Sequence, residues 1–194
     1  MSDYGEPLTL KQLLTVDLMR TIYSDEYVGQ TRARPAAIVA TWLSPEFTAV
    51  LLYRLAGRLI QSPFRPFGWL LHLFNRYLTN TDIAPFAVIG PGFRITHTSG
   101  VVIGAGVVAG RNLTVYNSTN LGARKRGGMR TQEDGMPRLG DGVFIGAGAR
   151  VLGPVNLGDG VVVGANAVLV TDVPPHTTVV GIPARPVSRA DDTT

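Results

Sequence analysis

The chain has 194 residues, of which 45% are hydrophobic, enough to fill the core of one domain and a small companion. Its net charge of +4 comes from 18 Lys and Arg against 14 Asp and Glu, and no groove-reading motif accompanies it, so nucleic acid is not expected as a partner. Because the chain has no cysteine, a disulfide framework, a thiolate zinc site and a cysteine nucleophile are excluded.

The beginning of the chain, residues 1–6, lacks the basic segment and apolar run of a secretion signal. The most apolar stretches, Val50 to Ala56 and Phe67 to Phe74, are interrupted or bounded by charged residues. Neither reaches the roughly 18 apolar residues that span a bilayer. We therefore expect a cytoplasmic protein without a membrane span.

Residues 1–80 are expected to form a helical N-terminal region. From Leu8 to Leu78 the apolar residues recur at helical spacing. Prolines divide this pattern into three or four helices, because the residue before a proline avoids the helical conformation. The breaks are expected at Arg34-Pro35, at Ser44-Pro45 and across 62–66.

Residues 81–187 carry an internal repeat with a period of six. The first aliphatic row runs through Ile83, Ile89, Ile95, Ile103, Ala109, Val115, Leu121, Leu139, Ile145, Val151, Leu157, Val163 and Leu169. A second row of small or aliphatic residues runs through Val143, Ala149, Val155, Val161, Ala167 and Val173. Two such rows indicate a solenoid in which each coil buries its aliphatic side chains against the next.

A period of six fits neither an α-helix nor a simple β-strand, but it fits a triangular coil with one short strand and one turn on each side. Three such hexads make one coil. Glycine and aspartate recur where the corners are expected, as in Gly140-Asp141-Gly142 and Gly158-Asp159-Gly160. These residue types suit the positive φ angles of sharp turns. The fold class predicted is mainly β, a parallel β-helix of hexapeptide repeats preceded by a small α-helical domain.

Two interruptions of the repeat are candidate functional segments. The phase slips by two residues between Ile95 and Ile103, where a polar run contains His97. A second interruption, residues 123–138, is polar, glycine-rich and charged, as expected of a loop that leaves the coil. Residues 188–194 are expected to be a flexible tail.

Several motifs resemble those of hexapeptide-repeat acyltransferases, and among these the serine O-acetyltransferases. They are Tyr53-Arg54-Leu55-Ala56, Asp82-Ile83-Ala84-Pro85, His97-Thr98-Ser99-Gly100, Gly146-Ala147-Gly148-Ala149, Val173-Pro174-Pro175-His176 and Gly181-Ile182-Pro183-Ala184-Arg185. The resemblance covers about residues 45–187. It implies a left-handed β-helix, an acetyl-CoA-dependent O-acetyltransferase without a metal, and a homotrimer that can pair into a dimer of trimers.

The resemblance also implies a catalytic pair, His97 and Asp82, which stand at the family's matching positions. In the family the histidine takes the proton of the acceptor hydroxyl, which then attacks the thioester carbonyl, and the aspartate orients the imidazole. This chemistry is sound in itself, because histidine titrates near neutrality and a hydroxyl is a poor nucleophile until a base removes its proton.

The same resemblance assigns further residues to binding. The cofactor-binding set near CoA is Ala123, Gly148, Ala149, Ala167 and Arg185. The substrate-binding set near the acceptor is Thr96, Asn117 and Arg138, with Arg138 able to recognise a carboxylate in a bidentate manner. Asn117, together with Ser118 and Asn120, is open to another interpretation, an inward polar ladder inside the coil.

The motifs depart from the family around the acceptor. Thr96 stands where the family has an aspartate, Ala84 replaces a histidine, and Gly135-Met136-Pro137 lacks the arginine expected after the loop. The resemblance implies L-serine as the first acceptor to consider, and these departures are the reason for the alternative, a sugar or specialised-metabolite hydroxyl. A non-catalytic trimeric scaffold is the alternative of another class.

The other two histidines are interpreted as structural. His72 lies among leucines on an expected helix, and His176 lies in a turn that ends the coil. A metal-dependent lyase on the same coil would need about three histidines converging on zinc. Only His97 lies within the repeats, so we discount that class.

Overall fold

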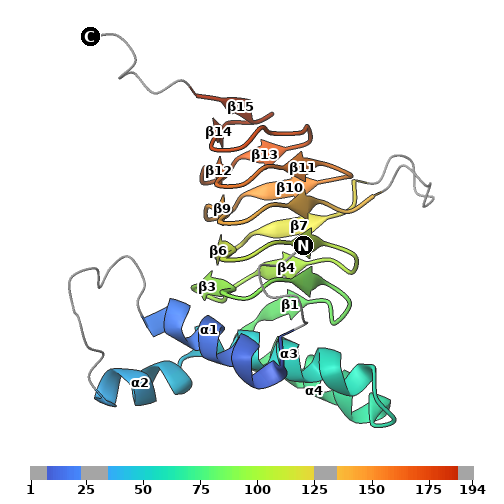
Figure 1. The fold of residues 1–194 in the computed structure, drawn as a ribbon. Helices are drawn as coiled ribbons and strands as arrows, with labels where there is room; N and C mark the ends of the chain where they lie inside the picture. The colour runs from blue at the N-terminus through green and yellow to red at the C-terminus, as the bar shows by residue number, and fades with distance from the viewer. Residues whose placement is uncertain (1–7, 23–34, 125–134, 188–194) are drawn as a thin grey trace.

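The computed structural model describes residues 8–22, 35–124 and 135–187, and they form a stack of β-coils with helices at its N-terminal end (Figure 1). The helices are α1 (Leu10–Ile22), α2 (Pro35–Trp42), α3 (Pro45–Ile60) and α4 (Arg65–Thr79). The predicted tail and the centre of the predicted loop, residues 125–134, lie outside the described residues.

Local sequence signals set the helix boundaries where the prolines predicted them. Ser44 caps α3, since its hydroxyl accepts a hydrogen bond from the Phe47 N–H at 3.2 Å, and Pro45 occupies the first turn. Helix α4 ends at Asn80, whose left-handed backbone (φ 53°) lets its N–H donate to the Arg76 carbonyl. The chain then enters the first strand directly.

Helix α3 is the centre of the helical region. Its buried residues Ala49, Tyr53, Ala56 and Ile60 follow helical spacing and face the neighbouring elements. Helix α4 crosses it closely at Gly68, where an added Cβ would lie 2.7 Å from the Ile60 backbone nitrogen. A side chain at that position would therefore push the two helices apart.

The strands form three parallel sheets, one on each side of the triangular coil. Sheet A holds β1 (Thr81–Ile83), β4 (Val101–Ile103), β7 (Asn120–Gly122), β10 (Arg150–Leu152) and β13 (Val168–Leu169). Sheet B holds β2 (Val88–Ile89), β5 (Val108–Ala109), β8 (Arg138–Leu139) and β11 (Asn156–Leu157). Sheet C holds β3 (Arg94–Thr96), β6 (Thr114–Tyr116), β9 (Phe144–Ile145), β12 (Val162–Val163), β14 (Thr178–Val180) and an antiparallel β15 (Arg185–Pro186).

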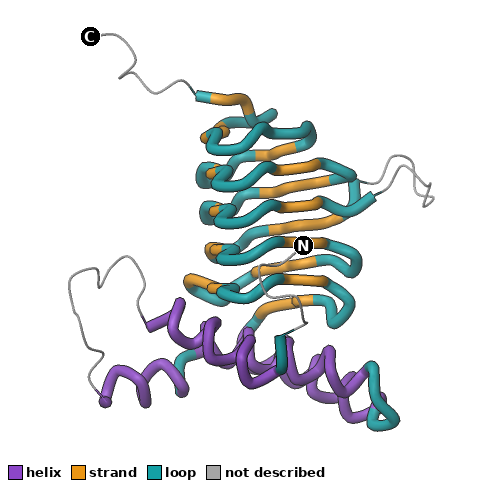
Figure 2. The backbone as a smooth tube through the Cα atoms, viewed as in Figure 1, coloured by secondary structure: helices purple, strands orange, loops and turns teal. Residues whose placement is uncertain are grey.

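Figure 2 shows the short strands separated by turns at each corner. The register confirms the repeat, because Ile83 pairs with Ile103, Ile103 with Leu121 and Leu121 with Val151 up one side of the stack. Every residue of both predicted aliphatic rows is buried. The predicted parallel β-helix with a helical N-terminal region is therefore confirmed.

The predicted corners also turn as the glycines indicated. Gly142 and Gly160 have φ angles of 66° and 65°. Between them the Asp159 carboxylate accepts the Asp141 N–H at 2.7 Å. The corner aspartates thus satisfy backbone donors of the coil below.

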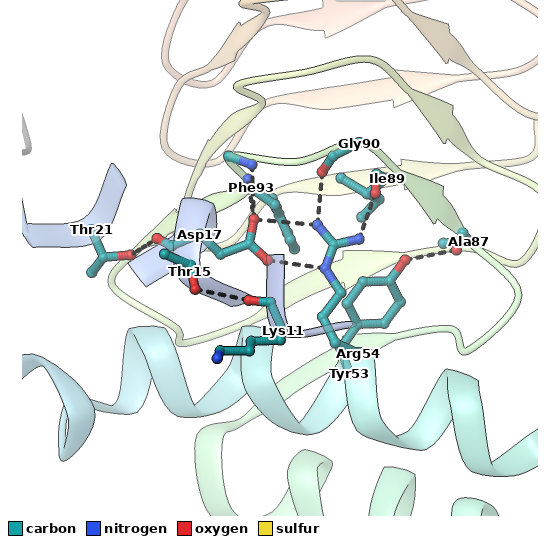
Figure 3. A network of polar contacts seen from close by, with 11 residues as sticks. Lys11, Thr15, Asp17, Thr21, Tyr53, Arg54, Ala87, Ile89, Gly90 and Phe93 are labelled. Atoms are coloured by element: carbon teal, nitrogen blue, oxygen red, sulfur yellow. Dashed lines mark hydrogen bonds and ion pairs between the residues drawn. The ribbon is translucent and has the colours of Figure 1, made fainter. Parts of the chain in front are cut away.

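A buried polar network fastens the helices to the first coil (Figure 3). The Asp17 carboxylate of α1 pairs with Arg54 of α3 at 3.0 Å and accepts the N–H groups of Gly92 and Phe93 at 2.8 and 2.9 Å. Arg54 also donates to the Gly90 carbonyl at 2.7 Å. Burial raises the pKa of Asp17, while Arg54 and the two backbone donors act to lower it. One carboxylate therefore joins two helices and a coil.

Candidate active site

The candidate site lies at the corner between sheets C and A of the first coil, where the phase slip was predicted. The register pairs Asp82 with Val102, twenty positions on, but Val102 with Asn120, only eighteen positions on. The two extra residues lie between β3 and β4, in the turn that contains His97. The coil bulges at this corner and keeps its register elsewhere.

The bulge exposes the side chain of His97, while hydrogen bonds hold the backbone of the turn in place. His97 has a left-handed backbone (φ 60°), an uncommon conformation for a residue other than glycine, and its side chain is exposed. Just after it, the Ser99 carbonyl accepts the Ser118 N–H at 2.8 Å, and the Gly100 N–H donates to the Asn80 carbonyl at 3.0 Å. The turn is therefore held by the coils on both sides while its imidazole stays available to a ligand.

Asp82 lies in β1, one coil before β4, and is half-buried. Its carboxylate faces α4, with Oδ1 at 3.7 Å from His72 Nε2 and Oδ2 at 3.4 Å from Arg76 Nη2. Among the residues that the structure describes, His97 forms no hydrogen bond or ion pair with Asp82. The two predicted catalytic residues thus lie at the two ends of the first coil, Asp82 in its first strand and His97 in the corner after its last, with Asp82 held from the helix side.

His72 was interpreted from the sequence as a structural residue among leucines, and its contact with Asp82 was missed. The side chain is largely buried, and burial lowers the pKa of His72 while Asp82 acts to raise it. The spacing of His72 and Arg76, one helical turn apart, indicated that they share a helix face. Nothing in the local sequence indicated that this face would meet Asp82.

Two of the three predicted acceptor residues lie at the His97 corner. Thr96 ends β3 directly before His97 and pairs in register with Tyr116. Asn117 follows Tyr116 at the same corner one coil further on, and its carbonyl accepts the Gly148 N–H at 2.9 Å. Arg138 lies in β8 of sheet B, so one chain does not bring it to this corner.

The alternative of an inward polar ladder at 117–120 is wrong. The polar residue that faces the interior is Thr119, which is fully buried and donates to the Tyr116 carbonyl at 2.7 Å. Asn117 and Asn120 are half-buried, and Ser118 is exposed. The side chains of the neighbours of Thr119 are therefore directed to the outside of the coil.

Three of the residues predicted to contact CoA line the same edge of the stack. Gly148 and Ala149 lie at the corner before β10, and Ala167 lies at the matching place before β13. The methyl groups of Ala149 and Ala167 are fully buried, and the N–H groups of all three residues donate to carbonyls of the coil. They can offer a ligand a close backbone surface, but no free N–H.

The other two predicted CoA residues lie farther apart. Ala123 follows β7 at the start of the loop and is half-buried. Arg185 lies in β15 at the opposite end of the stack from the helices and is exposed, with Nη1 donating to the Ala184 carbonyl at 3.0 Å (Figure 1). This set therefore extends along the stack away from His97 rather than forming one cluster.

The described residues contain no group of three His, Cys, Asp or Glu side chains arranged to hold a metal ion. None of the helices in the described part of the chain has the length and apolar character needed to cross a membrane.

Comparison with known proteins places these features in a family. Residues 136–171 match the model of the bacterial transferase hexapeptide (six repeats). A serine acetyltransferase of Mycobacterium tuberculosis is 40% identical over 158 residues, which cover 81% of this chain and 67% of that protein. The chain spans between 52% and 63% of the length of several other curated serine acetyltransferases that it matches.

Solved structures agree with the sequence relatives. Soybean serine acetyltransferase complexed with serine has a TM-score of 0.78 and 35% sequence identity, and a serine acetyltransferase in complex with CoA has a TM-score of 0.77 and 26% identity. Each comparison covers 92% of this chain and 69% of the other. The hexapeptide coils, the helical N-terminal region and these matches together show that the chain belongs to the serine acetyltransferase family.

Proposed function

We propose that this chain transfers the acetyl group of acetyl-CoA to the hydroxyl of a small acceptor, with L-serine as the first choice. The observation that carries the proposal is the two-residue bulge that exposes His97 at the closing corner of the coil that contains Asp82. Regular stacking of the coils does not require the two extra residues. A general base must be both fixed in position and accessible to the substrate, and the bulge gives the imidazole of His97 both properties. The relatives named above support L-serine and acetyl-CoA as substrates.

In the proposed reaction, His97 takes the proton of the acceptor hydroxyl as its oxygen attacks the thioester carbonyl. A carbon–oxygen bond forms and the carbon–sulfur bond breaks. The CoA sulfur leaves and takes the proton from the imidazolium, so His97 returns to its neutral form. Asp82 orients the imidazole and stabilises its charged form.

Binding of the two substrates is part of the same proposal. Thr96 and Asn117 contact the acceptor beside His97, while the backbone of Gly148, Ala149 and Ala167 lines the path of the pantetheine arm. Ala123 and Arg185 contact more distant parts of CoA. Because the N–H groups of the three corner residues are already used, their contribution to CoA binding is shape rather than hydrogen-bond donation.

We further propose that three chains assemble into the active unit, located in the cytoplasm. Arg138 is exposed on sheet B, away from the His97 corner of its own chain, so it reaches an acceptor only if a neighbouring chain brings it there. Val88, which is 62% exposed on the same sheet, offers apolar surface for such a contact. Sedimentation or light scattering gives the mass that distinguishes a trimer from a monomer or a dimer of trimers.

A sugar or another metabolite hydroxyl is the second candidate acceptor. Trp69 and Phe86 pack edge to face beside the Asp82 contacts, with ring centroids 6.1 Å apart, and their exposed fractions are 42% and 47%. Their ring surfaces, together with the small Ala84, offer an acceptor more apolar contact than serine can use.

The test is release of free CoA from acetyl-CoA with L-serine, homoserine and a panel of sugars and hydroxylated metabolites. Turnover with L-serine supports the first candidate, and turnover with another acceptor alone transfers the function to that compound. If no acceptor supports turnover although CoA binds, the proposal fails and the trimeric scaffold is the better account.

A further inference from the structure

Helix α4 contributes two side chains to Asp82, and both oxygens of the carboxylate are engaged. Arg76 lies 3.4 Å from Oδ2 and His72 lies 3.7 Å from Oδ1. Because they are four residues apart on one helix, they approach the carboxylate from the same side. An ionised carboxylate offers about four acceptor positions, so this arrangement leaves room for one more donor.

The helix that carries these two side chains is fixed to the coil. The His72 ring packs edge to face against Trp69 at 5.9 Å, and Trp69 packs against Phe86, which follows β1. At the end of the helix, the Thr79 hydroxyl lies 2.7 Å from the Thr81 hydroxyl, within a hydrogen bond. Helix α4 is therefore attached to the first coil both before His72 and after Arg76, the two residues that contact Asp82.

The two supports differ in charge. An arginine side chain is protonated at every pH that an assay uses. Burial lowers the pKa of His72 below its ordinary 6.5, so the imidazole is uncharged in a neutral solution. Arg76 is thus the permanent cation beside Asp82. As a bare surface ion pair, with the Arg76 side chain 50% exposed, this contact would add little to folding stability.

We propose that Arg76 is a positioning residue for acetyl transfer, which acts by fixing the Asp82 carboxylate so that its free acceptor positions face the imidazole of His97. This inference rests on the proposed function, in which Asp82 orients His97. Arg76 does not touch either substrate. Its effect appears in the rate because an imidazole that is not held in the productive orientation transfers protons less often.

The test compares Arg76→Gln with Arg65→Gln, which removes the same charge from the exposed N-terminal end of the same helix. We expect Arg76→Gln to lower kcat about tenfold, less than the ~100-fold that a misplacement of about 1 Å can cost. The KM for acetyl-CoA and the melting temperature stay near wild type. Arg76→Lys restores most of the rate, and Arg65→Gln leaves it unchanged.

A double-mutant cycle with Asp82→Asn separates positioning from a merely structural role. If Arg76 acts through Asp82, adding Arg76→Gln to Asp82→Asn causes no further loss of kcat. The same tenfold loss in both backgrounds, or a wild-type rate for Arg76→Gln or for Asp82→Asn, overturns the inference.

Failure of this inference is distinguishable from failure of the proposed function. Loss of turnover in His97→Ala together with a wild-type rate in Arg76→Gln rejects the positioning role alone. Unchanged turnover in His97→Ala, or no turnover with any acceptor in the wild type, rejects both.

Discussion

In the stack of coils each strand finds equivalent partners one coil away, whereas the helices meet the stack only at its first coils, through apolar residues of α3 and one buried polar network. Ile145 pairs with Val163 and with Val115, and the same contact recurs along sheet C. The helical region instead joins the first coil through contacts that do not recur, the packing of Tyr53 against Phe93 and the polar network of Asp17 and Arg54. Stability is therefore distributed in the coils and concentrated in the attachment of the helices.

The same contrast applies to function. Regular coils supply backbone surface, while the proposed chemistry lies where the regularity fails, at the His97 bulge and at the contact of α4 with Asp82. Most residues of the repeat lie away from the His97 corner, so we expect their substitution to leave the proposed chemistry unchanged. At the junction between helices and coils we therefore expect substitutions of Asp17 to affect stability and substitutions of Arg76 to affect the rate.

Asp17→Asn tests the junction most strongly. It leaves the buried Arg54 guanidinium without its anionic partner, and we expect a loss of about 3–5 kcal/mol of unfolding free energy. Urea unfolding followed by far-ultraviolet circular dichroism measures the loss. Helical signal should disappear at lower urea than the signal of the coils.

Asp172→Asn is the matched control within the coils. Its carboxylate is exposed and accepts the Asn156 N–H at 2.8 Å, a contact of the kind repeated at other corners. We expect a change within about 1 kcal/mol. A loss as large as that of Asp17→Asn would contradict the contrast between the two regions.

Removal of one methylene from the coil interior has a smaller expected effect. Ile145→Val should lower the unfolding free energy by about 1 kcal/mol, and Ile103→Val by a similar amount, because both side chains are fully enclosed by equivalent neighbours. Chemical denaturation of the two variants measures this. Losses that differ severalfold would show that the coils are not equivalent.

His72→Gln has the smallest expected effect, which is a change in how the melting temperature depends on pH. Since the folded protein lowers the pKa of His72 below its ordinary 6.5, the unfolded chain binds the proton more readily. The associated stability is present above the ordinary pKa and is lost as the pH falls through it toward the lower folded value. Melting temperatures at about pH 7.5 and about pH 5.5 should therefore differ less in His72→Gln than in the wild type.

The repeat and its interruption were predictable because they are periodic. A row of aliphatic residues every six positions requires a coil, and a slip of two residues in that row requires a bulge, which pointed to His97. The prolines predicted where the helices begin because their effect is local.

The contacts between helices and coils were not predictable, because they join residues far apart in the sequence without a repeat. Asp17 meets Phe93, and Arg76 meets Asp82, through the three-dimensional placement of α1 and α4. The polar ladder failed for a related reason. The two-residue alternation of the strand directs Thr119 and Leu121 inward, and polarity alone did not reveal which residues of that segment face the interior.

The measurement that tests the central claim most directly is steady-state CoA release with L-serine for the wild type and His97→Ala, with CoA affinity measured by calorimetry on both. We predict a loss of turnover on the order of 10²-fold or more with CoA binding retained. A variant that turns over serine at the wild-type rate would contradict the account, because it would remove His97 from the chemistry.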